Sequence, residues 1–230
     1  MTSRLKGLGA VLVIIGIAFV AAGGYAFMKT QEGAKSLQAF SAVENVKLAY
    51  NDQGQLVDRG DPAEAAAILS LLTNDWGYSV DKGELKPNDP LVNTASEYMY
   101  QMATISYHTL HAATTVNIPE DVVVNGQVVT KAGDYDFTND GRYWTGFDRT
   151  DPIQAAAREK IWTGTAHALI AELGVGSVTA SALTLGMGIA ALFALIGLTV
   201  VLTGLGLVWA TRAQTETAKA PAFKQVANPA

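Results

Sequence analysis

The chain has 230 residues, no cysteine and a net charge of −5, and only 16% of its residues are charged. Globular proteins average about 25% charged residues, and here the deficit falls in two stretches without Asp, Glu, Lys, Arg or His, residues 7–28 and 173–211. Because a bilayer core takes about 20 apolar residues of helix, these stretches exclude an ordinary soluble protein. The lack of cysteine excludes a disulfide-stapled module and a cysteine-ligated metal site.

The first predicted element is a transmembrane helix over residues 8–28, after a short N-terminus of residues 1–7. As a helix this segment would measure about 31 Å, close to the thickness of the hydrocarbon core. The alternative is a cleaved signal peptide, since Gly24 and Ala26 offer a small-residue cleavage pattern. A second transmembrane helix is predicted over residues 183–210, followed by a polar, disordered tail over residues 211–230.

Charges flanking the two spans predict their orientation. Arg4 and Lys6 precede the first span, and Arg212, Lys219 and Lys224 follow the second. The intervening residues 29–176 hold 11 basic and 20 acidic residues. Since basic flanks stay on the cytoplasmic side, we predict a plasma-membrane protein with both termini in the cytoplasm and an extracytoplasmic domain of residues 29–176. An acidic domain gives no support to nucleic-acid binding, which needs a basic patch.

Three Asp-Pro pairs predict the helices of the central domain. Asp61, Asp89 and Asp151 each precede a proline, and Asp at the N-cap followed by Pro at the first helical position favours a helix start. The predicted helices cover residues 62–73, 90–114 and 152–173. The third is expected to continue towards the second span, with a break near Gly174 and Gly176.

A small β insert is predicted between the second and third of these helices. Residues 122–124 and 128–130 are short β-branched runs around Asn125-Gly126, the strongest short-range hairpin signal. Residues 135–137 are a candidate third strand. The predicted fold class is therefore a membrane protein with two transmembrane α-helices flanking a mainly α-helical (α+β) exported domain with a small β-hairpin.

Small residues recur every four positions in both spans, so that each set lies on one helix face. They are Gly186, Ala190 and Ala194 in the second span, and Ala18, Ala22 and Ala26 in the first. Such faces let helix backbones approach closely in lipid. Two alternatives stay open: the spans pack on each other, or they pack on another subunit. No ionisable residue lies within either predicted span, which argues against a proton or ion path through them.

An aromatic–arginine segment precedes the third predicted helix. Its residues are Arg142, Tyr143, Trp144, Phe147 and Arg149. Aromatic residues with Arg are typical of protein–protein interfaces, and amphipathic rings also form collars at the membrane surface. The alternative is an aromatic lid on a small core.

Histidines and acidic turns are the candidate metal ligands. His108 and His111 share a helix face, and His167 lies on the third predicted helix, but nothing supplies the further ligand that a metal site requires. Asp134 with Asp136, and Asp140 with Asp148, lie in turns, where capping and turn formation explain them without calcium. We predict no metal, no cofactor and, since the nucleophile-elbow, zinc-protease and phosphate-loop motifs are absent, no enzymatic activity.

The layout resembles a family of small actinobacterial two-pass membrane proteins. The resemblance rests on the short basic N-terminus, the Gly-rich first span, and the segment Val178-Thr179-Ala180-Ser181 leading into a Gly/Ala-rich second span. Members are often labelled aromatic ring-opening dioxygenases, although a non-haem iron site requires a His-rich ligand set and this chain has 3 His. The architecture also looks like that of accessory subunits in actinobacterial respiratory supercomplexes.

These observations predict a non-catalytic subunit of a larger plasma-membrane complex, either respiratory or belonging to the cell envelope. Its expected partners are the lipid bilayer and other membrane-protein subunits. The alternative is a membrane-tethered sensor whose exported domain binds a ligand or a metal.

Overall fold

The computed structural model describes residues 2–219, and it describes side chains for residues 3–212. The chain divides into two compact units. The helix-pair unit comprises the described residues up to Ala34 and from Leu183 onward, and the central unit comprises Lys35–Ala182. Two long apolar helices thus flank a mixed α/β region with small sheets. The composition predicts the two helices, whereas the sheets go beyond the small hairpin expected in a mainly α-helical domain.

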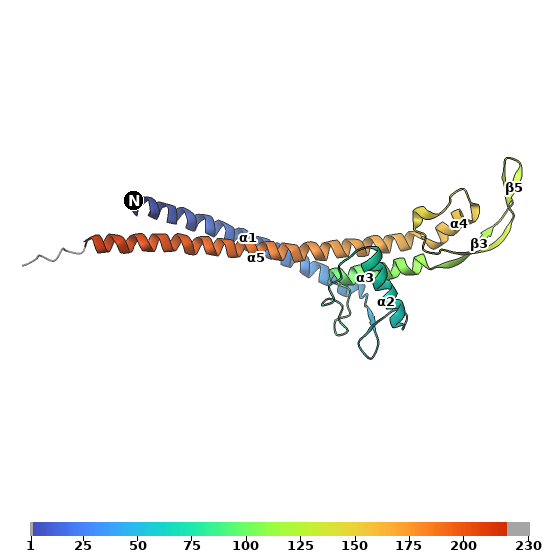
Figure 1. Cartoon of the computed structure of the whole chain (residues 1–230), viewed down its shortest axis with the longest axis horizontal. Helices are drawn as coiled ribbons and strands as arrows, with labels where there is room; N and C mark the ends of the chain where they lie inside the picture. The colour runs from blue at the N-terminus through green and yellow to red at the C-terminus, as the bar shows by residue number, and fades with distance from the viewer. Residues whose placement is uncertain (1, 220–230) are drawn as a thin grey trace, which may run out of the picture. The chain divides into compact units, whose positions relative to one another are not determined.

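The two long helices are α1 (Thr2–Glu44) and α5 (Gly164–Lys219). Within the helix-pair unit they run antiparallel, side by side (Figure 1). Neither helix ends where the apolar stretch ends: α1 continues beyond residue 28, and α5 continues into the predicted tail as far as Lys219. The disorder predicted for residues 211–230 stays a prediction, and residues 220–230 of that tail lie outside the described residues.

A seven-residue repeat of small residues forms the contact between the two helices. This glycine seam consists of Gly9, Gly16 and Gly23 on α1, facing Ala190, Gly197 and Gly204 on α5, and all six residues are buried. A Cβ atom added at Gly16 would lie 2.7 Å from the carbonyl oxygen of Gly197. The backbones therefore approach so closely that a side chain has no room. Contact residues that recur every seven positions are typical of helices packed as in a coiled coil.

The small-residue stripes predicted at a spacing of four fit this contact only on α5. Ala190 is 2% exposed, the backbone N of Ala194 would lie 2.9 Å from a Cβ at Gly23, and Gly186 faces Thr30. On α1, by contrast, Ala18 and Ala22 are exposed and do not belong to the seam.

The chain has no cysteine, so a disulfide can report this pairing directly. A Cβ atom at Gly186 would lie 3.7 Å from Cβ of Thr30, a separation that suits a disulfide. We expect the double variant Thr30→Cys/Gly186→Cys to cross-link under mild oxidation, measured as a mobility shift that reductant reverses. The matched variant Thr30→Cys/Gly188→Cys is expected to remain reduced, because a Cβ at Gly188 meets nothing within 4 Å. Equal cross-linking of both pairs would contradict the register.

The faces of the helix pair away from the seam are apolar and exposed. Ile14, Ile17 and Leu195 are 68%, 56% and 63% exposed. Both helices are long and apolar enough to cross a membrane, and only 11% of the most apolar window of each is buried. A core helix of a soluble protein would have most of this surface covered.

The central unit begins with a short β-ribbon and two helices. Strands β1 (Ala49–Tyr50) and β2 (Leu56–Val57) pair antiparallel and are followed by α2 (Pro62–Ser70), the π-helical turn η1 (Leu71–Asp75) and α3 (Ala95–Leu110). The predicted N-cap Asp61 is confirmed, since the N–H of Ala63 donates to its Oδ1 at 2.7 Å.

The prediction of a helix starting after Asp89 is wrong. Helix α3 is capped by Thr94, whose hydroxyl accepts from the N–H of Glu97, while the Glu97 carboxylate accepts from the N–H of Thr94. This reciprocal capping box satisfies two free amides together and so provides a stronger helix start than Asp89-Pro90. The predicted end near residue 114 is also wrong, because residues from Ala113 belong to a strand.

Four strands and two helical segments follow. Strand β3 (Ala113–Ile118) pairs antiparallel with β6 (Gly133–Thr138), and β4 (Val122–Val124) pairs with β5 (Gln127–Thr130). The predicted hairpin is confirmed: Asn125 and Gly126 have φ values of 53° and 79°, as a type I′ turn requires. The 3₁₀ turn η2 (Trp144–Gly146) and helix α4 (Pro152–Ile161) complete the unit.

Helix α4 ends earlier than the sequence predicts, whereas α5 has no break at Gly174 or Gly176. Asp151 caps α4 as expected, accepting from the N–H of Ile153 at 2.9 Å. The chain leaves the helix at Trp162, and α5 restarts at Gly164. The packing around Gly176 explains its place inside a helix: a Cβ there would lie 2.6 Å from ring carbons of Tyr98.

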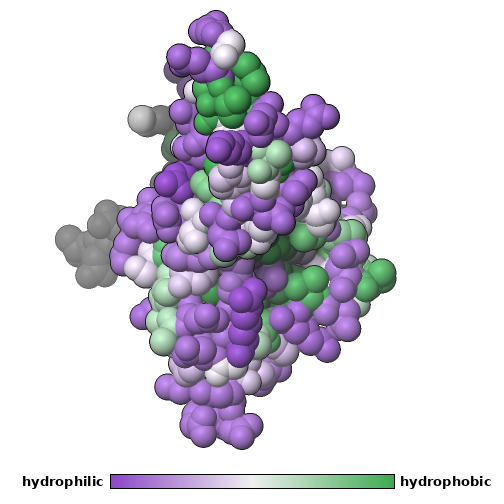
Figure 2. Space-filling model, turned by 90° about the vertical axis from the view of Figure 1, so that its right-hand side faces the viewer, coloured by the Kyte–Doolittle hydropathy of each residue, from purple (hydrophilic) through white to green (hydrophobic). Residues whose placement is uncertain are grey.

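Two hydrophobic clusters form the core of the central unit. The first joins α2, α3 and the start of the unit through Leu48, Ile68, Leu72, Tyr98 and Ala103. The second lies between η1, the β3–β6 ribbon and α4 and includes Leu71, Val116, Phe147, Ala157 and Trp162. Figure 2 shows that the face turned to the viewer is mostly hydrophilic, with hydrophobic side chains gathered in a few separate places.

Candidate functional site: a pocket beside a buried polar cluster

The three histidines have separate partners. Nε2 of His108 lies 2.8 Å from Oδ2 of Asp58. Nδ1 of His111 lies 2.8 Å from its own helix's Tyr107 carbonyl oxygen, and the His167 ring packs edge-on against Trp144 with ring centres 5.1 Å apart. Among the residues whose side chains are described, no group of three or more His, Asp or Glu side chains is placed to hold a metal ion.

The acidic candidates contact other residues of the chain, and the placement of Asp134 and Asp136 in turns is wrong, because both lie in strand β6. Asp134 accepts from Asn117 Nδ2 at 2.7 Å and Asp136 accepts from Thr115 Oγ1 at 2.9 Å, both across the β3–β6 ribbon. Asp140 lies 3.9 Å from Arg142. These contacts tie strands and turns together.

Asp148, the fourth acidic candidate, is held by one neighbouring residue. Its carboxylate accepts from both the hydroxyl and the backbone N–H of Thr150, at 2.7 and 2.8 Å. These hydrogen bonds lower the pKa of Asp148, because they favour the charged carboxylate. The pair shapes the turn that leads to the N-cap of α4.

The aromatic–arginine segment packs within the central unit. Phe147 is 5% exposed, and the Tyr143 hydroxyl accepts from Trp76 Nε1 at 2.8 Å. Cζ of Arg158 lies 4.1 Å from the centre of the Trp144 ring, a cation–π contact. Arg142 donates to the carbonyl oxygen of Asn139 at 2.8 Å.

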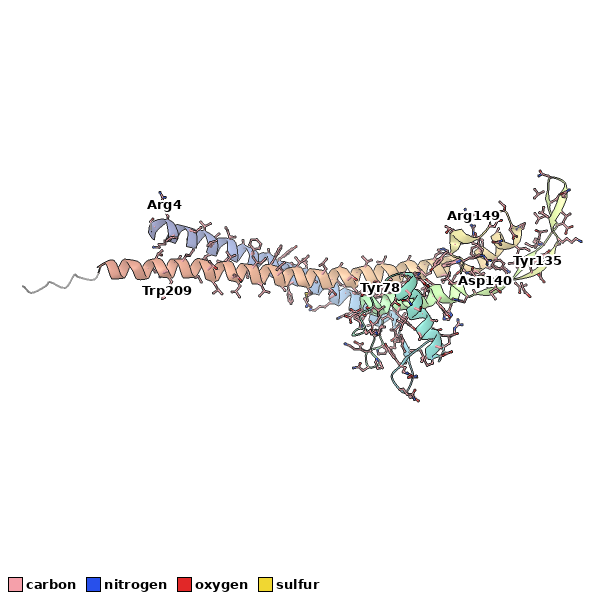
Figure 3. All side chains as sticks on the ribbon, in the orientation of Figure 1. Arg4, Tyr78, Tyr135, Asp140, Arg149 and Trp209 are labelled. Atoms are coloured by element: carbon pink, nitrogen blue, oxygen red, sulfur yellow. The ribbon has the colours of Figure 1, made fainter. Side chains whose placement is uncertain are left out.

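Arg149 differs from its neighbours, because it is exposed on the segment leading to α4 (Figure 3). The aromatic–arginine segment therefore covers the second hydrophobic cluster. Of its named residues, Arg149 and part of Tyr143 are exposed at the surface.

A buried polar cluster lies between β1, β2 and α3. It consists of Tyr50, Asp58, Glu97, Tyr100 and His108. Burial, and then the Glu97 carboxylate, raise the pKa of the Tyr50 phenol. Burial, and then the Asp58 carboxylate, raise the pKa of Tyr100. The cluster thus includes both the partly exposed His108, in contact with Asp58, and the buried Glu97.

Two atoms of this polar cluster, the hydroxyl oxygens of Tyr50 and Tyr100, are buried and have no hydrogen-bond partner among the described residues. Folded proteins leave few buried polar atoms without a partner, and each calls for an explanation. Sequence reasoning singled out His108 alone from this cluster, since its other members carry no motif and come together only through the fold.

Tyr50 also lines a pocket at the β1–β2 ribbon. The pocket has a volume of about 460 Å³, within the range of small-molecule sites. Its walls come from the ribbon, from α2 and η1, and from the loop before α3. The lining residues are Tyr50, Gly54, Leu56, Leu69, Thr73, Val80, Lys82 and Leu85.

Glu97 links the capping of α3 to pH. Burial raises the pKa of Glu97 above its ordinary value of 4.5, in opposition to the hydrogen bonds from Asn93 and Thr94. Because the pKa of Glu97 is higher in the folded than in the unfolded chain, protonation of Glu97 stabilises the fold. This stabilisation is complete below pH 4.5 and is lost as the pH rises through the pKa of the folded state. Glu97→Gln keeps an acceptor for the two amides and carries no charge.

We therefore expect Glu97→Gln to gain stability relative to the wild type as the pH rises from 4 towards neutrality, measured by denaturant unfolding of both proteins. Glu97→Ala leaves both amides unpaired and is expected to lower the unfolding free energy by about 1–2 kcal/mol at pH 4, with a smaller difference from the wild type at neutral pH. A stability difference between Glu97→Gln and the wild type that does not change with pH would contradict the raised pKa.

Two long apolar helices with a mixed α/β unit between them define a candidate two-pass membrane protein. Comparison of the chain with protein-family models, with curated proteins and with solved structures finds no match.

Proposed function

We propose that the chain is a two-pass plasma-membrane protein with both termini in the cytoplasm and the central unit on the extracytoplasmic side. The observation that carries the proposal is the surface of the helix pair. The glycine seam uses one face of each helix, and the other faces expose large apolar side chains such as Ile14 and Leu195. In water this surface would be unfavourable, whereas in lipid it is matched to the acyl chains.

Exposed aromatic residues near the ends of the predicted spans also support a membrane. Tyr25 is 65% exposed and Trp209 is 73% exposed. Such rings prefer the level of the lipid headgroups.

The antiparallel pairing bears on orientation. Gly9 faces Gly204, and Arg4 and Trp209 lie at the same end of the pair (Figure 3). Arg212 follows Trp209 closely in α5, so basic residues of both helices gather at this end. The positive-inside rule favours the cytoplasm for that end.

We further propose that the protein serves as a non-catalytic accessory subunit of a larger respiratory or cell-envelope complex. The exposed Ala18–Ala22 face of α1 lies outside the seam and supports a contact with a further helix. Arg149 and Tyr143 remain accessible for a contact outside the membrane.

Topology can be tested because the chain lacks cysteine. In intact cells, a membrane-impermeant maleimide is expected to label Asp52→Cys, which replaces an exposed residue of the central unit, and to leave Ser3→Cys unlabelled until the cells are lysed. The reverse pattern would contradict the orientation, and labelling of neither before lysis would contradict an exported central unit.

Assembly can be tested by extraction in a mild detergent followed by native electrophoresis. We expect a band much larger than the 24.2 kDa chain, with co-purifying subunits that mass spectrometry identifies. Ala22→Trp is expected to release the chain from that assembly, while Ala21→Trp, also exposed and one position along the helix, serves as the control. A monomeric band for the wild type would overturn the proposal.

A second candidate function is a membrane-tethered ligand-binding protein. The pocket beside Tyr50 favours it, since its lining leaves several aliphatic side chains only half-buried.

A further inference from the structure

The pocket beside Tyr50 combines a hydrocarbon lining with a single charge. Leu56, Leu69, Val80 and Leu85 supply aliphatic surface, and Lys82 is the one charged residue among the lining residues. All four aliphatic side chains also pack against the first hydrophobic cluster. The apolar wall is therefore anchored to the core of the central unit.

The positive charge of Lys82 is not neutralised within the described part of the chain. No ion pair of Lys82 occurs among the described residues, whose ion pairs involve Lys29, His108, Arg142 and Arg158. The two nearest acidic residues in sequence are engaged elsewhere: Asp81 accepts from the N–H of Gly83 at 2.7 Å, and Glu84 accepts from the N–H of Ser96 at 2.8 Å. The ammonium group is thus available to an anion at the pocket.

The turn between β1 and β2, which contributes Gly54 to the lining, is held in shape by its own hydrogen bonds. Oδ1 of Asn51 accepts from the N–H of Gln53 and of Gln55, at 3.1 and 2.8 Å. Gly54 takes a φ of 74° in the same turn, a conformation that glycine adopts without strain. Such a preformed turn reduces the ordering cost of binding.

We infer that this pocket binds a small amphipathic anion, specifically an aliphatic carboxylate whose chain lies along Leu56, Leu69, Val80 and Leu85 and whose carboxylate faces Lys82. The lining excludes the opposite charge, because a cation would meet Lys82 and no acidic lining residue. This inference deepens the second candidate function and does not depend on the orientation of the chain in the membrane.

The test is photoaffinity labelling of the full chain in lipid nanodiscs with decanoate that carries a diazirine near its methyl end. We expect labelled peptides from residues 56–85, and we expect excess unlabelled decanoate to abolish that labelling. Decylamine, which has the same chain and the opposite charge, is expected to compete at least tenfold less well. Labelling confined to the helix-pair unit, or equal competition by decylamine, would overturn the inference.

Two matched pairs of variants locate the site. Thr73→Trp fills the pocket from an exposed lining position and is expected to reduce labelling at least tenfold, whereas Asn74→Trp, its exposed neighbour outside the lining, is expected to leave labelling unchanged. Lys82→Gln is expected to weaken competition by decanoate about three- to fivefold, the size of an exposed ion pair. Lys86→Gln, an exposed lysine of the same loop outside the lining, is the control for charge.

Each variant's thermal unfolding is measured in parallel. Unchanged labelling in a folded Thr73→Trp protein would refute the site. If Thr73→Trp does not fold, the comparison of Lys82→Gln with Lys86→Gln decides, and equal competition in those two would refute the role of Lys82. The maleimide experiment on topology has a separate readout, so failure of the pocket and failure of the membrane orientation are distinguishable.

Discussion

Replacing Gly16 by leucine is expected to separate α1 from α5 within the helix-pair unit. A Cβ at this position would lie 2.7 Å from the carbonyl oxygen of Gly197 and 2.7 Å from the backbone N of Val201, both on α5. Backbone atoms of a helix cannot move aside as a flexible side chain can. Overpacking of this kind costs about 3 kcal/mol, which is about a hundredfold in the pairing equilibrium.

The Thr30→Cys/Gly186→Cys disulfide is the measurement. We expect its formation to fall to background when Gly16→Leu is added. Gly24→Leu is the matched control on α1, because a Cβ at Gly24 meets nothing within 4 Å. The same contrast is expected on α5 between Gly204→Leu, which would meet the Gly9 carbonyl oxygen at 2.6 Å, and Gly206→Leu, which meets nothing within 4 Å. If all four variants cross-link equally, the glycine seam is not the contact.

Replacing Gly176 by alanine is expected to destabilise the central unit, although alanine is the better helix former. The added Cβ would lie 2.6 Å from Cδ1 and Cε1 of Tyr98. That ring is 5% exposed, and its hydroxyl shares a hydrogen bond of 2.7 Å with the hydroxyl of Ser41. The ring therefore has little room to shift, and we expect a loss of about 1–3 kcal/mol.

Gly174 provides the control two residues away in the same helix. A Cβ there would lie 3.6 Å from Sδ of Met102, an ordinary contact. Gly174→Ala is therefore expected to stabilise α5 by up to about 1 kcal/mol through helix propensity. Thermal unfolding of the full chain in detergent should thus show shifts of opposite sign for the two Gly→Ala variants, with about 2–4 °C for each kcal/mol in a chain of this size.

A double variant separates the clash from a general effect on the helix. In a Tyr98→Leu background the ring is absent, so Gly176→Ala should cost much less than it does in the wild type. An equal cost in both backgrounds would mean that the destabilisation arises elsewhere in α5.

Several of the candidate residues form local structure within the chain. Asp134, Asp136 and Asp148 bond to neighbouring strands and turns, and the segment from Arg142 to Phe147 covers a hydrophobic cluster. A sequence pattern cannot separate an aromatic residue that binds a partner from one that packs against its own chain. Both need the same amphipathic side chain, and only the contacts differ.

The register of the two long helices could not be predicted from spacing in one helix. The sequence has 22 glycines, and small residues occur at both four- and seven-residue intervals in each span. Only the partner helix selects between these faces. Ala18 and Ala22 lie one or two positions from seam glycines and yet remain exposed, because a turn of 100° per residue moves them away from α5.

The sequence by itself determined the features that depend on a few neighbouring residues. These are the two apolar helices, the caps at Asp61 and Asp151, and the hairpin turn at Asn125-Gly126, since hydropathy, capping and positive φ act over one or two turns. Only the tertiary structure decided the glycine seam, the pairing of β3 with β6, and the meeting of Tyr50 with residues of α3. These features depend on which surfaces, distant in sequence, bury each other. The free energy of that burial is distributed over many residues, so no single residue or short pattern predicts it.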